Sequence, residues 1–338
     1  MVNIYNEYIP KPIRKITIYI REKAPNPIKK IAIVIGKIVE KIINHITDRK
    51  YWLKKSNIVK DYYKHKSLTK EEKKAIRFLK INQFFLDTNK LMYLSNNVNR
   101  YKRKLKKTKV FFDKNKNLHY LTHDNKRLYF PRLMPEKQIL NTYFQFLSEM
   151  DKDSPHLYTN DINELKGRVL FDCGVAEGLF PLTFINHLKK IVLFECDNNW
   201  VEALRATFAP YSDKVTIVQK YVSDTDSNNT ITLDSFSKTN NIIPDFIKMD
   251  IEGFEEKAIN GATNILKNGT NTICAICTYH TPYAEKNIIT TMNSLGFRPK
   301  YNKGYMIFHC EEPFSSPYLR RGVVRFYKKQ NTNSVYKK

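Results

Sequence analysis

The clearest chemical signature in the sequence is a group of charged residues at the end of an apolar run. The segment 244–255, PDFIKMDIEGFE, places Lys248, Asp250 and Glu252 at alternate positions. Charged side chains are costly to bury unless they are paired or functional, and open α/β sheets bind ligands at the carboxyl ends of their strands. We therefore expect these three residues to lie in an active site. The alternative is a salt-bridged strand end, with Glu255 as an ordinary acid in the first turn of a helix.

A second candidate site lies in the segment 168–178, RVLFDCGVAEG. An apolar run ends at Asp172 and is followed by Gly174 and Gly178. Glycines let a backbone turn sharply and approach a ligand closely, and the amides that open the next helix then point at that ligand. Glu195 ends the next apolar run, about 20 residues later, where an acid accepts hydrogen bonds from ribose hydroxyls. These residues predict a nucleoside-cofactor site rather than only a tight turn.

Histidines are the best candidates for proton transfer, because their pKa lies near neutrality. His280 follows a predicted strand, and we predict that it is the catalytic base, with Asp250 or Glu252 as alternatives. His156, in a polar loop upstream, is a further candidate at the substrate, although helix capping or packing would be its ordinary role. A metal held by Asp250, Glu252 and His280 is a third arrangement, but no ligand spacing requires one and we expect none.

A parallel sheet would bring these residues together, because the carboxyl ends of parallel strands meet at one edge. From residue 167 onward, strand-like and helix-like segments alternate, which is typical of a doubly wound α/β sheet. The predicted strands are 168–172, 191–195, 215–219, 245–250 and 272–278, followed by a terminal hairpin with strands near 304–308 and 323–327.

Four regions are expected along the chain. Residues 1–108 form a basic, mainly helical region, and residues 109–160 form a small β-hairpin and helix flank. Residues 161–330 form the cofactor-binding domain, and residues 331–338 form a flexible tail. Within the flank, short strands are predicted near 110–112, 118–121 and 128–130, and a helix is predicted over 135–150.

The first third of the chain is strongly basic, since residues 1–110 carry +21 of the total formal charge of +25. Apolar residues recur every three or four positions over 28–46, which predicts an amphipathic helix that either packs on its own protein or binds an anionic membrane surface. Thr69 and Glu72 have the spacing of a capping box and predict the start of another helix. The basic run 100–109 is either a solvated linker or a phosphate-binding patch. No RNA-binding signature lies nearby, so nucleic acid is not an expected partner.

The composition is that of a globular protein, with 42% apolar and 13% aromatic residues. No run approaches the ~18 apolar residues of a membrane span, and no signal peptide is evident. We expect a cytoplasmic protein, peripheral at the inner membrane face if residues 1–50 bind lipid. The five cysteines are expected to be small buried side chains. Cys274 and Cys277 form a C-x-x-C, but residues three apart on a strand face opposite sides and would not share a metal.

Five segments in order, DCGVAEG, LFECD, YVSD, ITLDSF and above all DFIKMDIEGFE, resemble the FkbM family of S-adenosylmethionine-dependent methyltransferases. The resemblance covers roughly residues 167–330. It implies the class I (Rossmann-like) methyltransferase fold, a mainly parallel seven-stranded sheet with an antiparallel last strand. It also implies S-adenosyl-L-methionine as cofactor and O-methylation, commonly of sugar or related hydroxyl groups.

The resemblance also implies site residues by position. The glycine motif with Asp172, Gly174 and Gly178 would hold the methionine part of the cofactor. Glu195 would bind the ribose, and Asp224 would lie near the adenine. Lys248, Asp250 and Glu252 would lie beside the methyl group. The sequence departs from the family pattern at Val175 and Ala176, where many members have Ala-Asn, and at Cys196, where a proline is common.

The methyl acceptor is expected to contact residues 120–160 and the loop 314–322, including Arg320 and Arg321. The sequence thus predicts an O-methyltransferase for a hydroxyl of a glycan or glycolipid precursor. One alternative is an RNA methyltransferase anchored by residues 1–110. Another is a catalytically inactive protein that docks on a membrane or partner through its basic region, although an intact Asp172, Glu195 and Asp250 argue against a decayed site.

Overall fold

A computed structural model of the chain describes residues 50–82, 107–159, 161–309 and 311–328. The predicted amphipathic helix at 28–46, most of the basic run 100–109 and the tail 331–338 lie outside these residues. The chain divides into two compact units, one made of residues 1–67 and 76–91 and the other of residues 68–75 and 92–338. Among the described residues, no helix is long and apolar enough to cross a membrane.

Two helical segments precede the sheet, one over 50–63 and α3 over Lys70–Asn82. The capping box predicted for α3 is present. The backbone N–H of Thr69 donates to Glu72 Oε2 at 2.8 Å, and the backbone N–H of Glu72 donates to Thr69 Oγ1 at 3.2 Å. This reciprocal pair satisfies donors that a helix N-terminus would otherwise leave open, so the predicted start of the helix is confirmed.

Seven strands form the central sheet: β4 (Val169–Cys173), β5 (Lys190–Phe194), β6 (Val215–Val218), β9 (Phe246–Met249), β10 (Ile273–Cys277), β11 (Phe297–Tyr301) and β12 (Val323–Lys328). Their order across the sheet is β11-β12-β10-β9-β4-β5-β6. Neighbouring strands from β10 to β6 are parallel, whereas β12 is antiparallel to both β10 and β11. This is the class I, Rossmann-like methyltransferase topology that the sequence predicted.

One predicted strand is wrong. The strand expected near 304–308 is an extended segment with a single bridge between Met306 and Arg320, and the sixth strand of the domain is β11. Gly296, with φ +84°, ends the preceding helix and allows β11 to begin at once. Pro299 lies within β11, and charged residues flank it. They are tolerated because β11 lies at the edge of the sheet, where one side of the strand needs no hydrogen-bonding partner.

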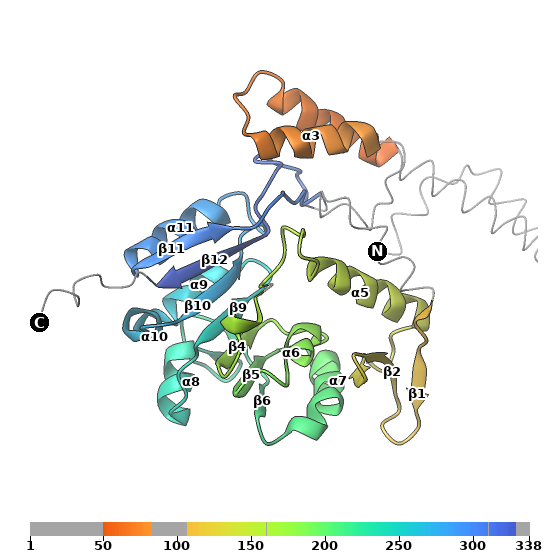
Figure 1. The fold of residues 1–338 in the computed structure, drawn as a ribbon, viewed down its shortest axis with the longest axis vertical. Coiled ribbons are helices and arrows are strands. Elements are labelled where there is room, and N and C mark those ends of the chain that lie inside the picture. The colour runs from red at the N-terminus through yellow and green to blue at the C-terminus, as the bar shows by residue number, and fades with distance from the viewer. Residues whose placement is uncertain (1–49, 83–106, 160, 310, 329–338) are drawn as a thin grey trace, which may run out of the picture. The chain divides into compact units, whose positions relative to one another are not determined.

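Helices cover both faces of the sheet (Figure 1). The helices are α6 (Leu179–Thr183), α7 (Asn198–Phe208), α8 (Leu233–Asn240), α9 (Glu255–Asn260), α10 (Thr263–Asn268) and α11 (Ala284–Ser294). Successive strand residues alternate between two cores. Leu170 and Cys277 pack in the core shared with α6 and α7, and Phe171 and Cys274 pack in the core shared with α8 to α11. Burial on both faces explains why the central strands read as continuous apolar runs.

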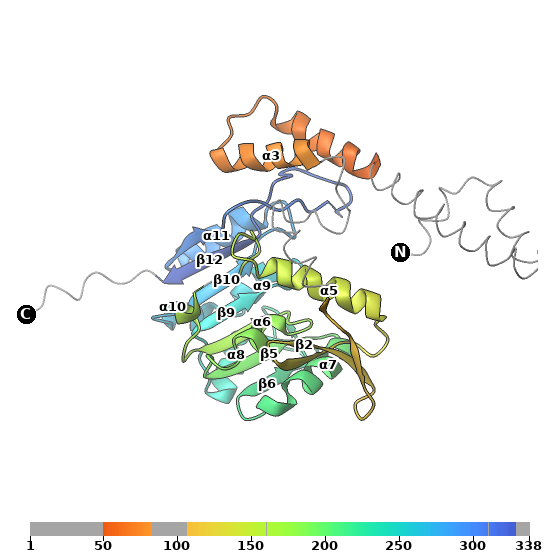
Figure 2. The same ribbon diagram turned by 45° about the vertical axis from the view of Figure 1, so that its right-hand side comes forward.

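The predicted flank is also present, as a small antiparallel sheet followed by a helix (Figure 2). It consists of β1 (Phe111–Asp113), β2 (Leu118–His123), β3 (Lys126–Tyr129) and α5 (Glu136–Glu149). The backbone N–H of Tyr129 donates to Thr207 Oγ1 of α7 at 3.0 Å, which ties the small sheet to a helix that covers the central sheet. The chain then runs from α5 through a loop to β4, and this loop carries His156.

Candidate active site

A buried ion pair joins the two chemical segments that the sequence singled out. Asp172 and Lys248 are register partners on the neighbouring strands β4 and β9. Lys248 Nζ lies 2.7 Å from Asp172 Oδ1 and also donates to the carbonyl oxygen of Gly174 at 2.8 Å. Both side chains are buried. Burial alone lowers the pKa of Lys248, but the carboxylates of Asp172 and Asp250 outweigh it and raise that pKa, so the lysine stays charged.

The glycine turn after β4 fits closely against the end of β9. Gly174 has φ +75°, and a Cβ at this position would lie 1.8 Å from the carbonyl oxygen of Asp250. Gly178 has φ +80°, and a Cβ there would lie 2.8 Å from side-chain atoms of Leu204 and Phe208. A residue with a side chain at Gly174 would force the two segments apart, so this glycine allows Asp172 and Asp250 to lie in one site.

Glu195, directly after β5, turns its carboxylate back toward the same loop. Its Oε2 accepts from the backbone N–H of Ala176 at 2.9 Å, and its Oε1 accepts from those of Cys196 and Asp197 at 2.8 and 2.9 Å. Each carboxylate oxygen can accept more than one hydrogen bond, so acceptor capacity remains for a ligand hydroxyl. Ala176, one of the departures from the family pattern, adopts φ +47°, a left-handed conformation that asparagine or glycine adopts more readily.

A small pocket opens where these segments meet. It is lined by residues of the glycine loop, of β9 and of α5 with the loop that follows: Asp172, Gly174, Val175, Ala176, Glu177, Phe180, Lys248, Asp250, Phe146, Glu149, Met150 and Tyr158. Two of these acids, Glu177 and Glu149, were not predicted as site residues. Glu177 is buried, and its Oε1 accepts a hydrogen bond from the backbone N–H of Leu179 at 3.2 Å. Burial raises the pKa of Glu177 well above the usual range.

Asp250 lies at the centre of a cluster of rings. Its Oδ2 accepts a hydrogen bond from the Tyr158 hydroxyl at 2.7 Å and lies 3.5 Å from His156 Nε2, while its Oδ1 lies 3.5 Å from His280 Nε2. Burial alone would raise the pKa of Asp250, but His156, Lys248 and His280 lower it to about 2. The structure therefore brings both predicted histidines to the same carboxylate.

His280 is held by an acid that the sequence interpretation left as an ordinary helix residue. Its Nδ1 lies 2.9 Å from Glu255 Oε1, and Glu255 is buried although it opens helix α9. This contact directs Nε2 toward Asp250.

Glu252 behaves differently from Glu255. It adopts φ +55°, and its side chain is 86% exposed with Oε2 3.6 Å from His280 Nε2, so it lies at the rim of the cluster.

Residues 205–299, which include Asp250 and His280, match the family model described as the methyltransferase FkbM domain. This part of the chain is therefore similar to the FkbM methyltransferase domain. No curated protein matches the sequence. The matched residues include the charged block 244–255 that first indicated a site.

Several solved structures resemble the chain. The crystal structure of methyltransferase FkbM from Methylobacillus flagellatus is 17% identical with TM-score 0.38, over 56% of this chain and 54% of that one. The tRNA m1G37 methyltransferase of M. jannaschii is 12% identical with TM-score 0.40, over 64% and 59%. A putative RNA methyltransferase from Pyrococcus horikoshii is 15% identical with TM-score 0.34, over 71% and 99%. The chain thus spans about half of the first protein's length, and these resemblances do not distinguish one methyl acceptor from another.

Three residues predicted for the site lie apart from the Asp172 pocket of the FkbM domain. Arg320 is buried and donates to the carbonyl oxygen of Tyr279 at 2.8 Å, so it supports the segment that carries His280. Arg321 donates to the carbonyl oxygen of Gly304 at 3.2 Å. Asp224 contacts Ser223 and lines a separate pocket with residues of α8 and α10. The roles predicted for these three residues remain predictions.

The cysteines largely follow the expectation. Cys173, Cys274 and Cys277 are buried, whereas Cys196 is partly exposed, and Cys310 lies outside the described residues. Cys274 and Cys277 point into different cores, as their spacing on one strand required. Cys277 faces the site, where its Sγ lies 3.5 Å from His156 Nε2.

Proposed function

We propose that the FkbM domain binds S-adenosyl-L-methionine and transfers its methyl group to a hydroxyl of a glycan or glycolipid precursor. The observation that carries the proposal is the buried Asp172–Lys248 pair, which joins the glycine turn to the charged strand end beside Asp250 and His280. In an open α/β sheet, this edge is where ligands bind.

The pocket suits a cofactor with positive charge at one end and a ribose at the other. Glu195 retains acceptor capacity that ribose hydroxyls would use. Glu177 and Glu149 line the opposite part of the pocket. Burial raises the pKa of Glu177, and such an acid gains its charge when a cation binds beside it. Glu177, with Glu149 lining the same pocket, would therefore hold the ammonium of the methionine moiety.

Methyl transfer requires that the acceptor oxygen be aligned with the methyl carbon and that a base accept the hydroxyl proton. The acceptor oxygen forms a bond to the methyl carbon as the carbon–sulfur bond breaks, and the electrons of that bond stay on sulfur. The hydroxyl proton passes to His280 Nε2. Glu255 holds Nδ1 of the ring, which keeps Nε2 available to a hydroxyl that lies beside Asp250.

The choice of a glycan hydroxyl rests on the family resemblance. An aromatic wall near the proposed base supports it, because the ring of Phe308 lies 6.1 Å from the ring of His280 and 5.6 Å from that of Tyr279. Aromatic faces of this kind pack against the apolar faces of sugar rings.

The test is methyl transfer from labelled S-adenosylmethionine to envelope glycolipid extracts and, separately, to total RNA, with the full chain. Label in the glycan fraction that is lost in His280→Ala supports the proposal. Label in RNA alone, with binding that weakens steeply as salt rises, would instead favour the RNA methyltransferase suggested by the +21 charge of residues 1–110. No label in either fraction favours the inactive docking protein.

We also propose a cytoplasmic site of action at the inner membrane face, with residues 1–50 binding anionic lipid. Co-sedimentation with vesicles of phosphatidylglycerol and phosphatidylcholine tests this, with the full chain compared with a chain lacking residues 1–50. Equal sedimentation of both chains would contradict the membrane role.

A further inference from the structure

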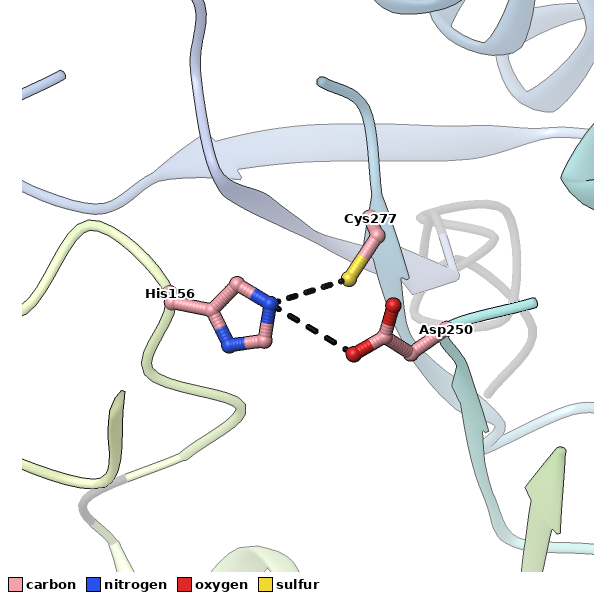
Figure 3. Close-up of side chains that lie close together, drawn as sticks. All are labelled: His156, Asp250 and Cys277. Atoms are coloured by element: carbon pink, nitrogen blue, oxygen red, sulfur yellow. Dashed lines mark hydrogen bonds and ion pairs between the residues drawn. The ribbon is translucent and has the colours of Figure 1, made fainter. Parts of the chain in front are cut away.

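Three side chains from distant parts of the chain converge at the end of strand β9. They are His156 from the loop after α5, Asp250 after β9 and Cys277 at the end of β10 (Figure 3). His156 Nε2 lies 3.5 Å from Cys277 Sγ and 3.5 Å from Asp250 Oδ2, and all three ligand atoms lie within 4.8 Å of one another. We propose that His156, Asp250 and Cys277 form a zinc-binding site.

The distances are those of a tetrahedral zinc site. Nitrogen and oxygen ligands bind zinc at roughly 2.0–2.2 Å and thiolate sulfur at roughly 2.3 Å, so two ligands on one tetrahedral ion lie about 3.4–3.6 Å apart. Both measured distances from His156 Nε2 fall in this range. His156 Nε2 also lies 3.3 Å from the Tyr279 hydroxyl. One imidazole nitrogen forms one hydrogen bond at a time, whereas one metal ion would bind the three ligand atoms together.

The ligand types select the metal. Thiolate and imidazole ligands favour zinc over magnesium or calcium, which prefer sites made of oxygen atoms. When zinc binds, the Cys277 thiol releases its proton to solvent, and the thiolate and the Asp250 carboxylate together balance the charge of the ion. The neighbouring charge of Lys248 is already balanced by Asp172.

Further side chains orient the proposed ligands as metal sites require. Glu149 Oε2 lies 3.8 Å from His156 Nδ1, the nitrogen that faces away from the proposed metal. The Tyr158 hydroxyl donates to Asp250 Oδ2 at 2.7 Å. The Tyr158 hydrogen bond orients the carboxylate, and the Glu149 carboxylate lies at ion-pair distance from the imidazole ring.

The loop that carries His156 is held firmly against the sheet. The backbone N–H of Val323 donates to the carbonyl oxygen of Pro155 at 2.9 Å, and Asn302 Nδ2 donates to that of Leu157 at 2.6 Å. A Cβ at Gly322 would lie 2.4 Å from the Pro155 oxygen, so only glycine allows the loop to approach this closely. A rigid loop is what a three-residue metal site needs.

Three protein ligands leave a fourth position on a tetrahedral ion, as in catalytic zinc sites. Asp250 also lines the pocket beside the glycine loop, so this position lies next to the expected methyl donor. A hydroxyl bound there would lose its proton to His280 more readily. This consequence rests on the proposed function, whereas zinc binding itself does not.

The test is metal binding by the full-length protein, measured separately from methyl transfer. The protein is dialysed against a chelator, the chelator is then removed, and the protein is titrated with zinc chloride. The zinc that each chain retains is measured by mass spectrometry. We expect about one zinc ion per chain in the wild type. Cys277→Ala and His156→Ala should bind at least tenfold more weakly.

Cys274→Ala is the matched control, because Cys274 is equally buried on the same strand but faces the other core. It should bind zinc like the wild type. No retained zinc in the wild type, or equal binding by Cys277→Ala, would overturn the proposal. If Cys277→Ala fails to fold, the wild type is titrated with cobalt(II) chloride. A thiolate-to-cobalt charge-transfer band supports the site, and its absence overturns it.

Discussion

Replacing Lys248 with methionine tests whether the Asp172–Lys248 pair holds the site together. Both side chains are buried, and their charged atoms are 2.7 Å apart. At an effective dielectric constant near 20, attraction at this distance is roughly 6 kcal/mol, and desolvation of the two ions offsets much of it. Methionine keeps the length of the side chain but leaves the Asp172 carboxylate without its partner. We expect the free energy of unfolding to fall by about 3–5 kcal/mol at pH 8.

The assay is urea unfolding followed by circular dichroism, with three comparisons. The exposed Lys189→Met is the matched control and should change stability by less than about 0.5 kcal/mol. Adding Asp172→Asn to Lys248→Met removes the stranded charge and should recover much of the loss. Without its lysine, Asp172 has a raised pKa in the folded state. The folded state then binds more protons than the unfolded state, so the loss should be smaller at pH 5 than at pH 8. A loss under about 1 kcal/mol, or no recovery in the double variant, would refute the reasoning.

Three further predictions concern the pocket and the base. The pKa of Glu177 is raised by burial, so the folded protein binds this proton more tightly than the unfolded chain and its stability falls as pH rises above about 4.3. In urea unfolding, Glu177→Gln should therefore be more stable than the wild type at pH 8, and the difference in stability should vanish near pH 4. The affinity of this variant for S-adenosylmethionine should be lower than that of the wild type. His280→Ala should lower kcat by about 10²–10⁴ with cofactor affinity unchanged, and unchanged turnover in this variant would assign the base to Asp250. Glu255→Gln should lower kcat less than His280→Ala does. Gly174→Ala should abolish cofactor binding in calorimetry, because its Cβ would meet the Asp250 carbonyl at 1.8 Å, and binding at wild-type affinity would contradict the packing described.

The sequence predicted those parts of the site that depend on strand ends alone. Asp172, Lys248 and Asp250 each lie in or directly after an apolar run, and parallel pairing brings such positions to one edge of the sheet. Glu252 follows the same alternate spacing. However, strand β9 ends at Met249, and the chain turns through a left-handed residue at Glu252, so its side chain points outward.

Other parts depended on burial or on contacts between distant segments. Glu255 has the sequence position of a solvent-exposed helix acid, and only the packing of α9 against the segment of His280 shows that it is buried. The C-x-x-C pattern correctly separated Cys274 from Cys277. It could not show that Cys277 meets His156, because the two residues are 121 positions apart in the chain. The edge strand β11 was missed because an edge tolerates a proline that a central strand does not.

The central claim is that the pocket at Asp172 binds S-adenosylmethionine, and calorimetric titration of the full-length protein with this cofactor tests it most directly. The variants are Asp172→Asn and Glu195→Ala, with Asp213→Ala as a control because Asp213 is an exposed turn residue before β6. We predict saturable binding by the wild type and Asp213→Ala, and at least tenfold weaker binding by the other two variants. Absence of binding by a folded wild type, or unchanged binding by Asp172→Asn and Glu195→Ala, would contradict the account.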